Sequence, residues 1–177
     1  MRVGIGYDVH PLISGRRLVL GGINVPFAKG LSGWSDADVL THAIIDALLG
    51  AAALGDIGSH FPPGEPQYKD ISSLTLLKTT GNKLVENGWQ IVNVDATIVA
   101  EKPRLSDFID RMRQQVSQTL GIAPSQVSLK ASTSAGLGFI GRGEGIAAYA
   151  IAMVQGSKDE SIYYPLRRKG RIFAPGR

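Results

Sequence analysis

Residues 38–54 read DVLTHAIIDALLGAAAL, and this stretch decides the fold. Small apolar residues recur in it at close to the helical period, and larger apolar residues widen the same face. The small residues are Val39, Ala43, Ala47 and Ala51, and the larger ones are Leu40, Ile44, Leu48 and Leu54. The pattern predicts a well-buried helix that packs closely on its neighbours.

Strand and helix patterns alternate outward from this helix. Strands are expected at 18–20, 23–27, 89–99, 126–133 and 146–154, and further helices at 72–87 and 106–120. Ser35 or Asp36 can cap the first helix, and residues 56–66 and 136–145 read as loops. Because the elements alternate without internal repeats, we predict an α/β fold of the α+β sandwich type, a mixed β-sheet with helices packed on one face.

Composition indicates one domain without a membrane anchor. Apolar residues make up 44% of the 177 positions, charged residues 19%, and no apolar run approaches the ~18 residues of a membrane span. The short apolar stretch at the N-terminus does not suit a signal peptide, and the lack of cysteine is compatible with a cytoplasmic location. These features predict a cytoplasmic protein.

The net charge of +4 comes from the C-terminal end. Residues 158–177 hold six Lys or Arg against two acids, which leaves 13 basic and 13 acidic residues before them. We therefore expect a single catalytic domain at 1–157 and a basic, flexible tail at 158–177. A neutral domain makes nucleic acid an unexpected partner, although the tail could contact a partner subunit or an acidic surface.

Asp8, His10 and His42 form a candidate metal site. Residues two apart on a strand point to one face, so Asp8 and His10 can converge on one point. One carboxylate and two imidazoles leave a fourth position open on a divalent ion, as in catalytic zinc sites. Asp46 lies one helical turn after His42 and is a candidate partner for its second ring nitrogen.

Two other interpretations of these residues remain open. A short Asp-x-His pair is commonly a surface pair rather than a ligand set. His42 and Asp46 could instead be a hydrogen-bonded pair in the core of the domain. The site therefore depends on what surrounds the three residues.

Four sequence blocks give that context: GYDVH at 6–10, SDADVLTH at 35–42, AEKPRL at 100–105 and GLGFIGRGEGIA at 136–147. Over residues 1 to about 155 the chain resembles the 2-C-methyl-D-erythritol 2,4-cyclodiphosphate synthases of the non-mevalonate isoprenoid pathway. The resemblance implies a homotrimer with active sites between subunits. It also implies conversion of 4-diphosphocytidyl-2-C-methyl-D-erythritol 2-phosphate into the cyclic diphosphate, with release of CMP.

The resemblance assigns roles to residues of this chain. Asp8, His10 and His42 would hold Zn²⁺ or another divalent metal, and Thr133 and Trp34 would act at the transferring phosphate. The substrate-binding positions that it implies are Asp8, His10, Trp34, Ser35, Asp56, Ile57, Gly58, Phe61, Glu65, Ala100, Pro103, Arg104, Leu105, Ser106, Ser132, Thr133, Phe139 and Arg142. Those from 100 to 106 would frame a cytidine, and Phe139 and Arg142 would line the trimer axis or reach phosphate.

Three positions depart from the pattern of that family. Trp34 stands where the family usually has histidine, and Pro63 stands where it usually has aspartate. Ala135 replaces the glutamate that holds Mg²⁺ or Mn²⁺, so this ion would depend on substrate phosphates and water.

Besides the synthase, the sequence allows two other functions to be considered. A related trimer could bind a nucleotide or isoprenoid diphosphate with impaired turnover because of these departures. An iron oxygenase with two histidines and one carboxylate usually has a β-rich barrel, which the helix carrying His42 argues against.

Overall fold

The computed structural model describes residues 1–157, so the expected tail at 158–177 lies outside the described residues. Its strands are β1 (Arg2–Ser14), β2 (Leu18–Leu20), β3 (Ile23–Val25), β4 (Lys29–Leu31), β5 (Trp89–Val99), β6 (Val127–Ser132) and β7 (Gly145–Gly156). Its helices are α1 (Val39–Ala52), α2 (Ile57–His60), α3 (Ser73–Glu86), α4 (Ile109–Leu120) and α5 (Gly138–Gly141), with short 3-10 helices η1 (Pro66–Tyr68) and η2 (Pro124–Gln126).

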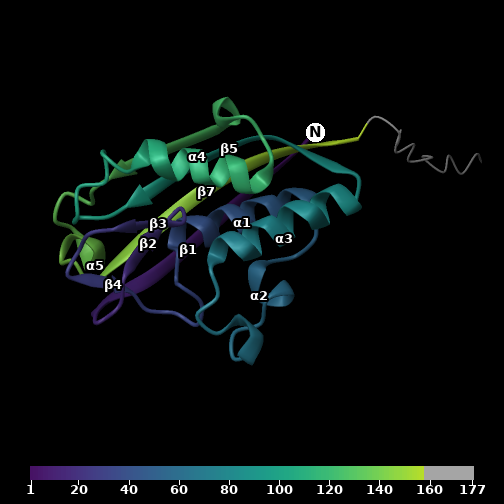
Figure 1. The fold of residues 1–177 in the computed structure, drawn as a ribbon. Helices are drawn as coiled ribbons and strands as arrows, with labels where there is room; N and C mark the ends of the chain where they lie inside the picture. The colour runs from purple at the N-terminus through teal and green to yellow at the C-terminus, as the bar shows by residue number, and fades with distance from the viewer. Residues whose placement is uncertain (158–177) are drawn as a thin grey trace, which may run out of the picture.

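The main sheet has five strands in the order β4-β1-β7-β5-β6. Strands β5 and β6 run parallel, and the other neighbours are antiparallel. Helix α1 packs on β1 and β7, α4 packs on β6, and α3 packs on α1 and α4, so the helices lie on one face of the sheet (Figure 1). The predicted mixed sheet with helices on one face is confirmed.

Several expected element boundaries differ from the structure. Helix α4 begins at Ile109 rather than Ser106, because the Ser106 hydroxyl bonds with Arg104 and Asp107 instead of capping backbone N–H groups. The expected loops contain the short helices α2, η1 and α5. Strand β7 is the centre of the sheet, because β1 and β5 pair with its two sides.

The cap of α1 is Asp38, not Ser35 or Asp36 as expected. Its buried carboxylate accepts hydrogen bonds from the backbone N–H and the hydroxyl of Thr41 in the first turn of α1. The same carboxylate accepts from the N–H groups of Gly21 and Gly22, which form the turn between β2 and β3 with φ of 55° and 73°. One side chain therefore caps the helix and joins it to the hairpin.

Helix α1 lies unusually close to β1. A Cβ on Gly6 would lie 1.9 Å from the carbonyl oxygen of Ala43, and a Cβ on Gly4 would lie 2.2 Å from that of Ala47. The small residues of the helix therefore face glycines of the strand. This close approach brings His42 on α1 beside Asp8 and His10 on β1.

Gly6→Ala is expected to destabilise the fold by about 3 kcal/mol, because the added methyl group meets backbone that cannot move alone. The matched control is Gly156→Ala, since nothing lies within 4 Å of a Cβ at that strand position. Thermal unfolding should show a Tm lower by about 10 °C for Gly6→Ala only. Equal Tm values for the two variants would contradict this account of the packing.

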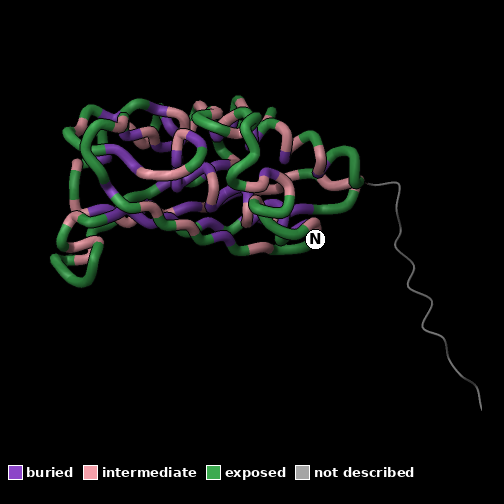
Figure 2. The backbone as a smooth tube through the Cα atoms, turned by 90° about the horizontal axis from the view of Figure 1, so that it is seen from below, coloured by how far each residue is buried: buried purple, intermediate pink, exposed green. Residues whose placement is uncertain are grey.

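The face of the sheet opposite the helices is apolar and exposed. Along β1 and β7, inward residues are buried or half-buried and most outward ones are exposed, and buried and exposed segments alternate along the strands in Figure 2. The exposed large apolar residues here are Val3, Ile5, Tyr7, Val9 and Ile13 of β1 and Tyr149 and Ile151 of β7. They are cross-strand neighbours, because Ile5 pairs with Ile151 and Tyr7 with Tyr149. Such a patch is typical of a surface that another chain covers.

Candidate functional site

The three expected metal ligands converge in the structure. The Asp8 Oδ2 atom lies 2.9 Å from His10 Nε2 and 2.9 Å from His42 Nδ1, and the two ring nitrogens are 3.1 Å apart. The strand supplies two of the groups and α1 supplies the third. Three ligand bonds of ~2.0–2.1 Å to a tetrahedral zinc would separate the donor atoms by about 3.3 Å, so the triad fits such an ion with small adjustments.

Hydrogen bonds on the far sides of the imidazoles orient their lone pairs toward this point. His10 Nδ1 lies 2.8 Å from the carbonyl oxygen of Ser32, which can only accept, so we assign the proton to Nδ1. His42 Nε2 lies 2.9 Å from the Ser73 hydroxyl. That hydroxyl donates to the carboxylate of Asp36, so its oxygen accepts from Nε2–H. In these tautomers His10 Nε2 and His42 Nδ1 are free to bind a metal.

The charge of Asp8 also suits a metal ligand. Burial alone would raise its pKa, but in the chain without a metal the close contacts of the carboxylate with the His10 and His42 rings hold the pKa well below its usual range. For His42, burial would lower the pKa, and the bond to Asp8 outweighs it and raises the pKa. A carboxylate that stays ionised beside two imidazoles attracts a cation in place of protons.

Asp46 is not the partner of His42 that the sequence suggested. Its Oδ1 atom accepts the backbone N–H of Ile57 at 2.7 Å, at the start of α2. The partners of His42 Nε2 are instead Ser73 and, at 3.2 Å, Ser35. Sequence reasoning missed Ser73 because it lies 31 residues from His42 in the sequence and belongs to a different helix.

Ser73→Ala is expected to weaken metal binding by about 10- to 100-fold, because outer hydrogen-bond partners of metal ligands typically contribute that much. The adjacent Ser72→Ala is a matched control, since Ser72 is exposed and its side chain caps nothing. Titration with Co²⁺, followed by its visible absorption, measures the affinity of both variants. Equal affinities would show that Ser73 does not orient His42.

A pocket of about 220 Å³ adjoins the triad. It brings together some of the residues expected to contact substrate, and Tyr68 and Leu76 also line it. The expected residues on its wall are Asp8, His10, Trp34, Ser35, Ile57, Gly58 and Phe61, and Pro63 lies beside them. Asp56 does not line this pocket, because its carboxylate caps α2 by accepting the N–H of Ser59.

Trp34, on the wall of this pocket, is bonded to Glu65, which does not line it. The indole N–H of Trp34 donates to the backbone carbonyl of Glu65 at 2.9 Å. The expected donation from Trp34 to a phosphate would require this bond to break. The same bond ties the segment around Glu65 to the wall of the metal pocket.

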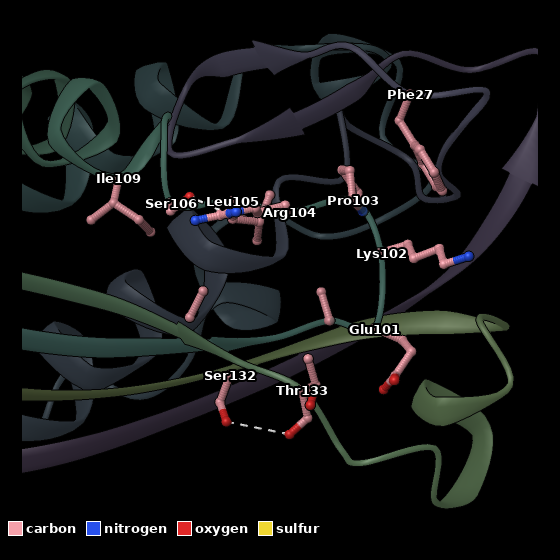
Figure 3. A pocket seen from close by; sticks show the side chains of 12 residues that line it. Phe27, Glu101, Lys102, Pro103, Arg104, Leu105, Ser106, Ile109, Ser132 and Thr133 are labelled. Carbon is pink, nitrogen blue, oxygen red and sulfur yellow. Dashed lines mark hydrogen bonds between the residues drawn. The ribbon is translucent and has the colours of Figure 1, made fainter.

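A second, larger pocket of about 950 Å³ lies where β5 and β6 end (Figure 3). The expected residues Ala100, Pro103, Arg104, Leu105, Ser106, Ser132 and Thr133 line it, together with Phe27, Glu101, Lys102, Ala131 and Ile109. Phe27 and Ile109 gave no signal in the sequence, because an apolar residue of a pocket wall has the same local pattern as a core residue. The wall combines apolar side chains with hydroxyl groups and two cations.

Phe139 and Arg142 line neither of these two pockets. Arg142 donates two hydrogen bonds to the exposed Glu144, at 2.8 and 3.0 Å. It lines a third cavity, of about 320 Å³, with Lys29. The roles expected for Phe139 and Arg142 at a trimer axis stay predictions.

The two main pockets are separate within one chain. They share no lining residue among positions 1–157. Asp8 and His10 lie on β1, whereas the larger pocket lies at the end of β5. Strand β7 runs between these two strands. Two strand spacings amount to about 10 Å. A ligand that needs both surfaces therefore faces two half-sites that do not merge in one chain.

Within the part of the chain that the structure describes, no helix is long and apolar enough to cross a membrane.

Comparisons with known proteins agree on one family. The model of the YgbB family matches residues 1–155. The chain is 60% identical to 2-C-methyl-D-erythritol 2,4-cyclodiphosphate synthase of Dehalococcoides mccartyi, over 87% of this chain and 98% of that protein. It is 59% identical to the synthase of the same name from Syntrophomonas wolfei, over 88% and 99% of the two chains.

Solved structures show the same fold. A CDP complex of IspF from Plasmodium falciparum superposes with a TM-score of 0.78 at 30% identity, covering 88% of this chain and 96% of that one. The bifunctional IspDF of Campylobacter jejuni gives a TM-score of 0.85 at 38% identity, covering 88% of this chain and 42% of that one.

Proposed function

The chain belongs to the YgbB family and acts as a 2-C-methyl-D-erythritol 2,4-cyclodiphosphate synthase, a lyase of the non-mevalonate isoprenoid pathway, and we propose that its active site lies between two subunits. Residues 1–157 form the single catalytic domain in this proposal. The observation that carries the assigned function is the convergence of Asp8, His10 and His42 on one point beside a pocket. A binding protein with impaired turnover is not favoured, because relatives at 60% identity are synthases.

The metal in this proposal is Zn²⁺ held by Asp8 Oδ2, His10 Nε2 and His42 Nδ1. One carboxylate and two neutral imidazoles suit zinc, and the open side of the triad faces the pocket. When bound, the ion supplies Lewis-acid polarisation of a phosphate oxygen.

The larger pocket takes the cytidine diphosphate end of the substrate in this proposal. The P. falciparum relative with this fold binds CDP. The apolar side chains of Pro103 and Leu105 can frame a base, while the hydroxyl groups of Ser132 and Thr133 can donate to phosphate. Mg²⁺ or Mn²⁺ would bind together with the substrate. The phosphates and water would supply ligands for this ion, because Ala135 offers none.

The reaction is an internal phosphoryl transfer in which the 2-phosphate attacks the β-phosphorus and CMP leaves. Such a reaction needs positioning and charge neutralisation rather than covalent catalysis by the protein. In this chain, the triad and the hydroxyl of Thr133 would fix the two ends of the diphosphate. Phe61 and Pro63 would exclude water from the pocket beside the triad.

A homotrimer brings the two half-sites together. The exposed apolar face of β1 and β7 is the surface that the neighbouring subunits would cover, and Ile5 at its centre is 72% exposed in the single chain. A closed ring of heterologous contacts places different edges of two chains against each other. The metal pocket of one subunit can thus meet the nucleotide pocket of the next.

Removal of the metal tests this function directly. Chelation is expected to lower CMP release from the substrate by several hundredfold or more, because the ion contributes several kcal/mol to stabilisation of the transition state. Adding Zn²⁺ back should restore the rate. Full activity in protein that elemental analysis shows to be free of metal would contradict the proposal.

A further inference from the structure

Glu101 lies in the larger pocket beside the segment that carries its hydroxyl groups. Its Oε2 atom is 3.4 Å from the hydroxyl oxygen of Ser134 and 3.4 Å from the backbone nitrogen of Gly136. Figure 3 shows its carboxylate on the same side of the pocket as Thr133. The carboxylate therefore faces the part of the wall that offers donors to phosphate.

No cationic side chain pairs with Glu101 among residues 1–157, although cations are close in sequence. Arg104 donates its Nε–H to Ser106, and Arg142 pairs with Glu144. The carboxylate thus has no ion-pair partner among the described residues, although Lys102 lines the same pocket. A diphosphate that enters this pocket would be repelled by it unless a cation lies between them.

A divalent cation changes the sign of this interaction. Mg²⁺ is usually bound by one or two carboxylates together with phosphate oxygens and water. Among the described residues that line this pocket, Glu101 is the one with a carboxylate. Its two contacts lie on either side of Ala135, which has only a methyl group to offer.

We propose that Glu101 is the protein ligand of the divalent cation that accompanies the diphosphate of a nucleotide in this pocket. The assignment rests on the proposed function, because it requires a nucleoside diphosphate to bind here. It gives this chain a ligand for the ion at a position different from 135.

The test measures CDP binding by calorimetry on the zinc-loaded protein, with and without Mn²⁺. Mn²⁺ is expected to tighten CDP binding to the unmodified protein by about tenfold, within the usual range for two coupled ligands. In Glu101→Gln the effect of Mn²⁺ should disappear. Without Mn²⁺ the variant should bind CDP more tightly than the unmodified protein, because the repulsion is gone. These changes of opposite sign are not expected from a loss of folding.

Two further variants make the experiment decisive. Glu144→Gln removes a carboxylate of the neighbouring loop, which pairs with Arg142, and should leave the Mn²⁺ effect intact. Glu101→Gln combined with Ala135→Glu should recover the effect, because a carboxylate returns next to the same turn. Electron paramagnetic resonance of Mn²⁺ counts the ions bound with CDP in each variant.

The outcomes separate this proposal from the function on which it rests. If Glu101→Gln binds CDP and keeps the full Mn²⁺ effect, the assignment of Glu101 is wrong and the nucleotide pocket stands. If the unmodified protein binds no CDP, the nucleotide pocket and the assignment both fall.

Discussion

His42→Ala is expected to contain no bound metal and to release CMP about a thousandfold more slowly than the unmodified protein. Its Nδ1 atom is one of three ligand atoms, and the remaining Asp8 and His10 cannot hold the ion in place of it. Losing the Lewis acid removes several kcal/mol of transition-state stabilisation, and each 1.36 kcal/mol is a factor of ten in rate.

His60→Ala is the matched control for this prediction. His60 Nε2 bonds to the carbonyl of Leu54 at 2.7 Å, and the residue does not line the metal pocket. Elemental analysis should find one zinc per chain in the unmodified protein and in His60→Ala, and none in His42→Ala. Circular dichroism checks that all three are folded. Retention of zinc by His42→Ala would contradict the assigned ligand set.

Two inactive variants are expected to restore activity when they assemble together. His42→Ala damages the metal pocket, and Ala131→Trp places a large side chain in the nucleotide pocket at an exposed strand position. In a mixed trimer, some sites combine the intact metal half of one variant with the intact nucleotide half of the other. With equal amounts and random assembly, about a quarter of the sites are intact.

The measurement is CMP release by the co-expressed pair, compared with each variant alone. Light scattering should give about three times the chain mass of 18.8 kDa for the unmodified protein and for both variants. A site contained in one chain predicts no recovery, whatever the oligomer. Each variant carries a different affinity tag, so that mixed trimers can be isolated. If these mixed trimers recover no activity, an active site between subunits is contradicted.

Periodicity predicted most elements of this fold because it reports local burial. The helix at 39–52 and the strand at 89–99 were both visible as repeats of apolar residues, with errors of a few positions at most. Strand β4 (KGL) and helix α2 (IGSH) were not, because neither short segment contains a repeat of apolar residues, unlike the equally short β2 (LVL). The cap of α1 was also predicted wrongly. Asp38 takes this position because its carboxylate also binds the N–H groups of Gly21 and Gly22, which are distant in the sequence.

The ligand types of the candidate metal site could be predicted, but not their orientation. Asp8 and His10 share a face because a strand repeats every two residues, and this follows from the sequence alone. The partner of His42 was predicted as Asp46 by helical spacing, whereas the structure uses Ser73 from another helix. Spacing within one helix cannot report which side chain of a neighbouring helix packs against it.

The sequence by itself determined the class of fold, the residue types that can bind a metal and the apolar character of the strands. Only the tertiary structure decided that Asp8, His10 and His42 meet, because β1 must pass under α1 at the distance that Gly6 allows. It also decided that the indole N–H of Trp34 donates to the backbone carbonyl of Glu65, and that β7 separates the two pockets. The physical reason is that propensity and periodicity act over a few residues, whereas these contacts depend on sheet order and on packing between distant segments.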